Sequence, residues 1–237
     1  MKKRELADTV EQQYFDSSST IPLKEDDGTR DIVPLLPFII SGGSNTERYY
    51  FTHISDTTKY KFHIKPEYFG DESNFTEIFP QRIERILERN ADAKIFCVFD
   101  WDSIYKSKEE QIKYCDFVEQ FKNEIANGNV VICPSMPCIE YWFLLHFCDD
   151  KSLYKSYSKV SSPLAPHIKP CFPNPNVALK KLLKQEKYLR DSTWVKNLCS
   201  NSKLDLAIER AENNIKIAIA NSDLENQSYT YIYKIFK

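Results

Sequence analysis

The sequence predicts an α/β fold, with a four-stranded parallel sheet flanked by helices and a mostly helical C-terminal extension. Short apolar runs alternate with segments of helical periodicity as far as Asp149. Two of the runs are almost continuously apolar, as in strands that are buried on both faces. Such alternation of strands and helices is typical of a mostly parallel sheet. The strands are expected near residues 36–40, 60–64, 94–99 and 130–134.

The helices between these strands follow from the same pattern. Asn45 or Thr46 is expected to cap a first helix that continues through Ile54. A second helix is expected over residues 80–89, with Pro80 tolerated in its first turn. A third, amphipathic helix is expected over 108–127, with Ile112 and Phe117 among its inward residues, and an apolar helix over 138–147.

The rest of the chain divides into two further parts. Residues 1–30 are polar without a sustained period and indicate an N-terminal arm. The α/β domain is expected over 31–150. The C-terminal extension, 151–237, is expected to pack on the same core. It should have a long loop over 151–175, helices over 176–183 and 203–220, and a docking strand or helix over 229–236.

Composition limits the functional classes. The 237 residues are 42% hydrophobic and carry a net charge of −2, so any nucleic acid must bind through a local patch and not through bulk charge. No stretch has the roughly 18 apolar residues that span a bilayer, and the first twelve residues do not resemble a secretory signal. The seven cysteines form no CxxC pair and indicate reduced thiols. We therefore expect a cytoplasmic protein without a membrane partner.

Asp100 and Asp102 directly follow the third expected strand. Two carboxylates two residues apart in extended backbone point to the same side and can share a hard cation such as Mg²⁺. Such a cation can activate water and stabilise charge on a phosphate. The alternative is an N-cap and turn before the next helix.

Two further segments follow strands. The turn from Ser41 to Glu47 contains Gly43 and Ser44, and lets a phosphate approach backbone N–H groups at a helix N-terminus. Glu47 is either a ligand or a carboxylate that stabilises the helix end. Glu140 begins an apolar helix after the fourth strand, where it is either near the strand ends or a cap. Because parallel strands end on one side, Glu47, Asp100, Asp102 and Glu140 are expected to converge there.

These segments together resemble the RloB-like proteins. Members of that group typically carry an EGxxTExxYF-like segment after an apolar strand, a later strand that ends in DxD, and an SxPCxExWxLLHF-like segment. The corresponding segments here are GGSNTERYYF at 42–51, VFDWD at 98–102 and SMPCIEYWFLLHF at 135–147. Residues 188–190 and 230–236 also look like the family's C-terminal part. The resemblance covers most of residues 33–237, and its third segment is the most specific.

The resemblance implies a TOPRIM-type domain that holds Mg²⁺ or Mn²⁺. Glu47, Asp100 and Asp102 would bind the metal, and Glu140 would be a further ligand or would position the water. RloB-like proteins often accompany an ABC-type or AAA-type ATPase in bacterial anti-phage or abortive-infection loci. Related TOPRIM effectors act as nucleases, in some cases on tRNA. One departure stands out, because Gly42 occupies the position where the family usually has its first Glu.

Two hypotheses follow. In the first, the chain is a metal-dependent endonuclease or endoribonuclease that works with an ATPase partner, with Glu47, Asp100, Asp102 and Glu140 as catalytic residues. Its nucleic acid would meet Gly43, Ser44, Arg48 and Lys106. In the second, loss of the family glutamate leaves a degenerate TOPRIM module. That module would bind nucleic acid, or act as a sensor, within the ATPase complex.

Overall fold

The computed structural model describes residues 35–43, 45–65 and 75–237, of which 75–78 are described by their backbone alone. The expected N-terminal arm, residues 1–30, lies outside this part of the chain. Residues Leu35–Lys237 cluster as one compact unit. None of the described helices is long and apolar enough to cross a membrane.

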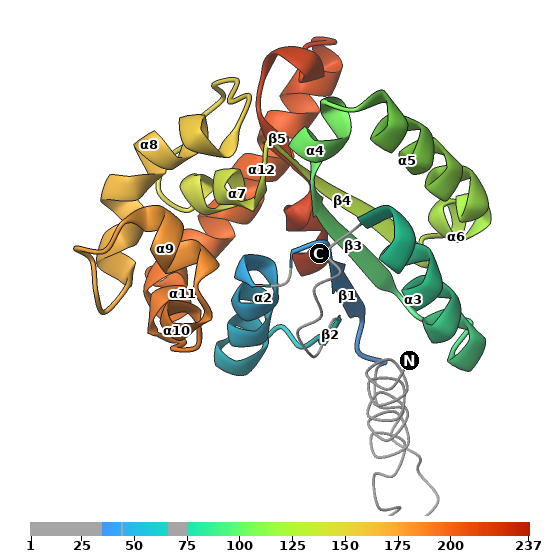
Figure 1. Ribbon diagram of the computed structural model, residues 1–237, viewed down its shortest axis with the longest axis horizontal. Helices are drawn as coiled ribbons and strands as arrows, with labels where there is room; N and C mark the ends of the chain where they lie inside the picture. The colour runs from blue at the N-terminus through green and yellow to red at the C-terminus, as the bar shows by residue number, and fades with distance from the viewer. Residues whose placement is uncertain (1–34, 44, 66–74) are drawn as a thin grey trace, which may run out of the picture. The chain divides into compact units, whose positions relative to one another are not determined.

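The fold is α/β with a mostly parallel sheet, as the sequence predicts (Figure 1). The described strands form a five-stranded sheet in the order β2-β1-β3-β4-β5. The first four are parallel to their neighbours, and β5 is antiparallel to β4. Their bounds are β1 Phe38–Ser41, β2 His63–Lys65, β3 Ile95–Asp100, β4 Val130–Met136 and β5 Tyr229–Thr230.

Helices cover both faces of the sheet (Figure 1). One face carries α3 (Phe75–Arg89), α5 (Lys108–Gln120) and α6 (Lys122–Asn127). The other carries α2 (Thr46–Thr57) and α7 (Ile139–Leu145), and the short α4 (Trp101–Tyr105) follows β3. The third expected helix is wrong in two respects, because Phe121 interrupts it and Ile112, expected to face inward, is 62% exposed. The second begins at Phe75, which places Pro80 inside it.

The C-terminal region is helical, as predicted. Its elements are α8 (Tyr157–Ile168), α9 (Leu179–Lys184), α10 (Glu186–Leu189), α11 (Thr193–Cys199), α12 (Lys203–Ala220), and the 3-10 helices η1 (Lys169–Cys171), η2 (Leu224–Asn226) and η3 (Ile232–Phe236). Two of these helices, α8 and α12, pack against α7. The long loop expected over 151–175 is wrong, because α8 and η1 together occupy residues 157–171. The aromatic tail forms both an edge strand and a 3-10 helix.

The chain reverses direction in the sheet between β1 and β3. It moves outward from β1 to β2, and then returns to place β3 on the other side of β1. In open α/β sheets, ligands bind beyond the carboxyl ends of the strands at such a switch point. The backbones of β1 and β3 are joined there by a bond from the Gly42 N–H to the Val98 carbonyl, at 2.9 Å. A ligand site is therefore expected at the carboxyl ends of β1 and β3.

Candidate active site

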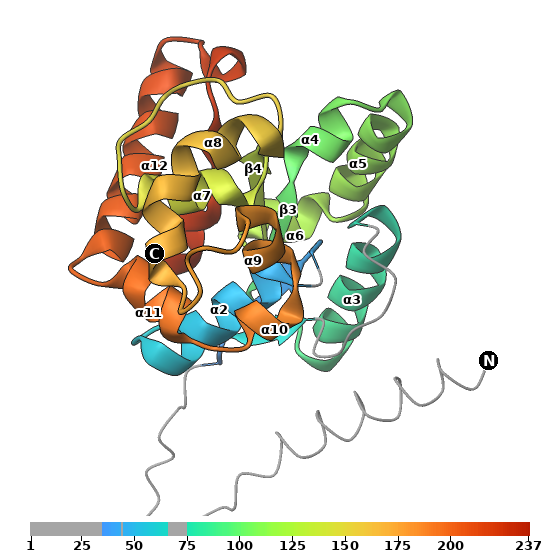
Figure 2. The same ribbon diagram turned by 60° about the vertical axis from the view of Figure 1, so that its left-hand side comes forward.

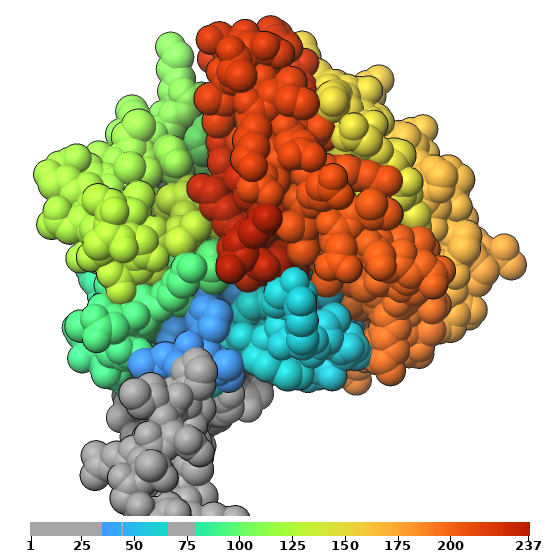
Figure 3. Space-filling view, turned by 180° about the vertical axis from the view of Figure 1, so that it is seen from behind, coloured from blue at the N-terminus to red at the C-terminus, as the bar shows by residue number. Residues whose placement is uncertain are grey.

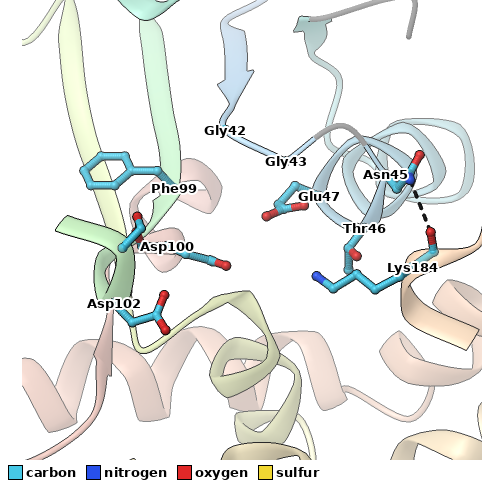
Figure 4. Close-up of a pocket in the computed structure, with 10 residues that line it drawn as sticks. Gly42, Gly43, Asn45, Thr46, Glu47, Phe99, Asp100, Asp102 and Lys184 are labelled. Atoms are coloured by element: carbon cyan, nitrogen blue, oxygen red, sulfur yellow. Dashed lines mark hydrogen bonds between the residues drawn. The ribbon is translucent and has the colours of Figure 1, made fainter. Parts of the chain in front are cut away.

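A pocket of about 350 Å³ opens at the carboxyl ends of β1 and β3 (Figure 4). It brings together the turn after β1, the start of α2, the end of β3 and the end of α9. The side chains of Glu47, Asp100 and Lys184 point toward one another across it. Its walls are formed by Gly42, Gly43, Asn45, Thr46, Glu47, Phe99, Asp100, Asp102, Ser103 and Lys184.

Asp100 is the last residue of β3 and is held between the sheet and α7. The backbone N–H of Ile139, the first residue of α7, donates to Asp100 Oδ1 at 2.9 Å. Burial raises the pKa of Asp100 well above its usual range, and the nearby charges of Glu47 and Glu140 raise it further. Asp100 therefore binds a proton more readily than an exposed aspartate, unless a cation offsets the surrounding negative charge.

Asp102 lies in the same pocket but in a different local structure from the one expected. Helix α4 begins at Trp101, so the two aspartates do not share a stretch of extended backbone. The Asp102 carboxylate pairs with Lys106 Nζ at 2.6 Å, one turn further along α4. Lys106, which was expected to contact phosphate, thus contacts Asp102. The Lys106 side chain is 55% exposed, and such a pair contributes little to stability.

Glu140 is fully buried in the first turn of α7. Its Oε1 lies 3.3 Å from Lys184 Nζ, and its Oε2 has no hydrogen-bond partner among the described residues. Ligand atoms of Asp100, Cys138 and Glu140 all lie within 4.8 Å of one another. A buried carboxylate oxygen without a donor is costly, which makes this oxygen a candidate ligand for a further group such as a cation.

Glu47 lies at the start of α2 and is 4% exposed. Burial raises its pKa; the charge of Lys184 opposes this shift and the charge of Glu140 adds to it. Gly43 allows this position, because a Cβ atom on residue 43 would lie 1.9 Å from Glu47 Oε2. Gly43 therefore borders the pocket as expected of a turn residue, and its lack of a side chain makes room for a carboxylate.

Lys184 is the residue of this site that the sequence did not indicate. It is the last residue of α9, and two side chains at the start of α2 fix that end of the helix. Asn45 Nδ2 donates to the Lys184 carbonyl at 3.2 Å, and the Thr46 hydroxyl donates to the Leu183 carbonyl. Burial disfavours the charged amine, but the carboxylates of Glu140, Glu47 and Asp100 outweigh burial and raise the pKa of Lys184.

Tyr157 of α8 lies beside this lysine. Its ring centroid is 5.8 Å from Lys184 Nζ, and its buried hydroxyl has no hydrogen-bond partner among the described residues. Burial, followed by the charge of Glu140, raises its pKa to about 12. Sequence patterns did not indicate Tyr157, because it lies in the segment that was expected to be a loop.

The remaining residues expected to bind phosphate are placed as follows. The Arg48 guanidinium lies over the Tyr49 ring, 5.3 Å from its centroid, and Arg48 does not line the pocket. Ser44 lies outside the described residues. Their roles, like those of Gly43 and Lys106, stay predictions.

The donor set fits a hard divalent cation. Asp100 and Glu140 offer carboxylate oxygens, which Mg²⁺ and Mn²⁺ prefer, and Glu47 lines the same pocket. Cys138 is a poor ligand here, because burial raises its pKa far above the usual range and keeps the thiol protonated. Asp100 and Glu140 lie in the tight cluster, whereas Glu47 and Asp102, the other two expected ligands, line the pocket outside it.

Comparison with known proteins connects this site to a family. No curated protein and no solved structure matches the chain. The family model described as RloB-like protein matches residues 38–237, which include all three segments around the pocket. That match covers most of the sequence, so the chain belongs to the RloB-like family.

Proposed function

We propose that this chain is a metal-dependent nuclease that hydrolyses phosphodiester bonds in the pocket between β1 and β3. The observation that carries the proposal is the charge of the site. Three carboxyl groups, those of Glu47, Asp100 and Glu140, are close enough to influence one another, whereas Lys184 is the one cation among the lining residues that faces all three. A divalent cation would offset this excess and use the free oxygen of Glu140.

Each residue of the pocket would have a role that follows from its position. Asp100 and Glu140 would hold the cation, with Glu47 completing the ligand set from the opposite wall. A bound Mg²⁺ or Mn²⁺ would supply Lewis-acid stabilisation of the charge that develops on the phosphate. Lys184 keeps its proton in this environment, so its ammonium is available to bind a phosphate oxygen. Asp102 lines the outer part of the pocket, where it is paired with Lys106.

The resemblance described above supports a biological setting for this activity. RloB-like proteins often accompany ABC-type or AAA-type ATPases in anti-phage loci, so we propose that this chain is the nuclease effector of such a pair. The ATPase would hold the effector silent or signal to it. The substrate would be RNA, including tRNA, or DNA, and incubation with both kinds of nucleic acid distinguishes them.

A second function is favoured by a separate observation. Gly42 contributes no carboxylate to the pocket, and Lys184 Nζ lies 3.3 Å from Glu140 Oε1, where it partly neutralises the site without a metal. A chain that relies on this lysine would bind nucleic acid without cutting it, as a sensor subunit of the ATPase complex.

The test compares Asp100→Asn with Asp116→Asn. Asparagine keeps the oxygen that accepts from the Ile139 N–H, and it removes a charge from a crowded site, so the fold should keep its melting temperature. Asp116 is exposed on α5, away from the pocket, and provides a matched control. Each protein is incubated with labelled RNA and DNA in Mn²⁺, Mg²⁺ or EDTA, alone and with the partner ATPase, and the cut ends are sequenced.

We expect metal-dependent cleavage by the wild type and by Asp116→Asn. Cleavage by Asp100→Asn should be slower by about 100-fold or more, because a ligand that stabilises transition-state charge has been lost. Equal cleavage by Asp100→Asn would overturn the proposed site. Nucleic-acid binding without cleavage, together with full phage defence from Asp100→Asn cells, would establish the second function.

A further inference from the structure

Charge is unevenly distributed along this nearly neutral chain. Between residues 151 and 203 there are eleven lysines and arginines but two acidic residues, which gives a local charge of +9. The whole chain carries −2, so the rest of the sequence is strongly acidic. The chain therefore contains a basic segment, which corresponds to helices α8 to α11, although its net charge is near zero.

Many lysines of this segment lack the ion pairs that several lysines elsewhere form. On α5, α6 and α12, for example, Lys113 pairs with Glu109, Lys122 with Glu119 and Lys216 with Glu212. Six exposed lysines of the basic segment form no ion pair with any residue of the described chain. We call them the basic surface: Lys155, Lys159, Lys180, Lys181, Lys187 and Lys196.

Several residues of the basic surface lie close in sequence to Lys184 or to its neighbour Tyr157, and Lys184 lines the pocket. Lys180 and Lys184 are four residues apart on α9 and therefore lie on the same face of that helix, while Lys187 follows on α10. On the other side of Lys184, Tyr157 lies between Lys155 and Lys159 in sequence, and its ring contacts the Lys184 ammonium. Figure 2 shows α9 and α10 beside α2, whose first turn borders the pocket, and α8 above them.

We propose that the basic surface binds the phosphate backbone of a nucleic-acid strand and directs it into the pocket. The inference rests on the proposed function, because it assumes that the pocket acts on a phosphodiester. It adds that α8, α9 and α10 hold the substrate, and not the β1–α2 turn alone. Exposed lysines without ion pairs attract the phosphates of a nucleic acid whatever its base sequence, and nucleic-acid binding depends on this attraction.

The composition of this surface argues against an anionic membrane as the partner. Membrane-surface helices combine basic residues with exposed large apolar side chains. Of the exposed large hydrophobic residues in the described chain, Leu153 is the one that falls between residues 151 and 203. The surface thus offers charge with little apolar area, which matches a polyphosphate and not a bilayer.

The test is a triple variant, Lys180→Ala/Lys181→Ala/Lys187→Ala. These lysines make no ion pairs within the described chain, so the variant should fold with an unchanged melting temperature. The matched control is Lys108→Ala/Lys122→Ala/Lys216→Ala, which removes the same charge from α5, α6 and α12. Binding of fluorescent single-stranded RNA and DNA is measured by anisotropy in EDTA, across a series of salt concentrations, so that cleavage plays no part.

Each phosphate contact contributes about −0.7 to the slope of log K against log salt for a single strand. We expect the triple variant to lose about 2 from the steepness of that slope, and to bind about 100-fold more weakly at about 0.1 M salt. The control should behave like the wild type. An unchanged slope in the folded triple variant, or no binding by the wild type, would overturn the inference. The inference would also be overturned if the protein bound vesicles that contain phosphatidylserine through these lysines but did not bind oligonucleotides.

The two proposals can fail separately. Lysine-dependent binding in EDTA without metal-dependent cleavage supports the basic surface and contradicts the nuclease. Cleavage that depends on Asp100 but proceeds equally well in the triple variant supports the nuclease and contradicts the basic surface.

Discussion

The Glu47 carboxylate fills the space that a side chain on Gly43 would need, so a substitution at Gly43 tests the site. A methyl group on residue 43 would lie 1.9 Å from Glu47 Oε2 and 2.3 Å from its carboxyl carbon. No backbone atom is among its closest neighbours, so the buried carboxylate must move. We expect Gly43→Ala to keep its fold and to bind Mn²⁺ at least about 10-fold more weakly, as measured by calorimetry.

Gly42→Ala is the matched control for that variant. At residue 42 the added carbon would meet Phe99 Cβ at 3.4 Å and the Val98 carbonyl oxygen at 3.7 Å, which are ordinary contacts. Equal Mn²⁺ affinity in Gly42→Ala and Gly43→Ala would show that displacement of Glu47 does not affect the metal.

Gly42→Glu restores the carboxylate that the family usually carries. The backbone at Gly42 is not left-handed, since Gly128 is the one glycine of the described chain with positive φ. The new side chain would begin at the edge of the pocket, so it adds a ligand and a negative charge. We expect tighter Mn²⁺ binding and a larger rise in melting temperature on adding Mn²⁺ than in the wild type. Weaker binding would mean that Lys184 neutralises the site instead of a metal.

The sequence predicted most of the acidic side of the site and little of the basic side. Asp100, Glu47 and Glu140 each follow a strand, and parallel strands bring such positions to one edge. Lys184 is far from these motifs and reaches the pocket through the packing of α9 against α2, which local periodicity does not encode. The extended backbone expected at Asp102 is wrong, because α4 begins directly after β3.

At the scale of elements, the contact between α2 and α9 positions Lys184 and can be tested through Thr46. The Thr46 hydroxyl is buried and donates to the Leu183 carbonyl. Thr46→Val keeps the shape but leaves that carbonyl unsatisfied, which should cost about 1–3 kcal/mol of stability in urea unfolding. Loss of the contact should also weaken nucleic-acid binding, because the end of α9 is no longer fixed.

Thr52→Val provides the comparison within the same helix. Its hydroxyl donates to the Arg48 carbonyl one turn earlier, a bond that adds little to helix stability. We expect a change of less than about 0.5 kcal/mol and unaltered binding. If both variants lose the same stability, the contact between α2 and α9 has no special role.

The errors at this scale have a common cause, which is that tertiary packing overrides local signals. Pro163 and Pro166 suggested a loop, since a proline inside a helix costs about 3 kcal/mol. Yet Val160, Leu164 and Ile168 form a fully buried stripe along α8, and their packing against α7 and η1 maintains the helix. At Ile112 an apolar residue that was expected to be buried is exposed, because α5 packs on the sheet through Phe117.

At the scale of the whole described unit, one core joins the sheet to the C-terminal helices. Trp142 of α7 donates to the Tyr50 hydroxyl of α2 at 2.8 Å, and its ring stacks on Phe236 at 5.8 Å. Figure 3 shows the C-terminal residues in the middle of one face, between the α3–α6 side and the α9–α11 side. The C-terminal tail therefore completes the core, and we expect residues 35–237 to unfold in one transition.

His146 lies within this core and should make the stability of the whole protein depend on acid. Its Nδ1 lies 3.0 Å from the Trp142 carbonyl, and its Nε2 has no hydrogen-bond partner among the described residues. Burial, together with the charges of Lys203 and Arg210, lowers its pKa from 6.5 to about 3, although the hydrogen bond to the Trp142 carbonyl opposes this shift. The unfolded chain therefore takes up a proton that the folded protein refuses, and stability falls as pH drops below about 6.5 toward about 3.

The size of this effect can be isolated with His146→Asn, which keeps an N–H near the Trp142 carbonyl and does not titrate. Asp100 and Glu47 have raised pKa values and act in the opposite direction, so the wild-type curve alone mixes these contributions. Between pH 7 and pH 5, the wild type should lose about 2 kcal/mol more unfolding free energy than the variant, as measured by urea titration at each pH. Parallel pH curves for the two proteins would show that His146 is protonated in the folded core, and that Nε2 has found an acceptor there.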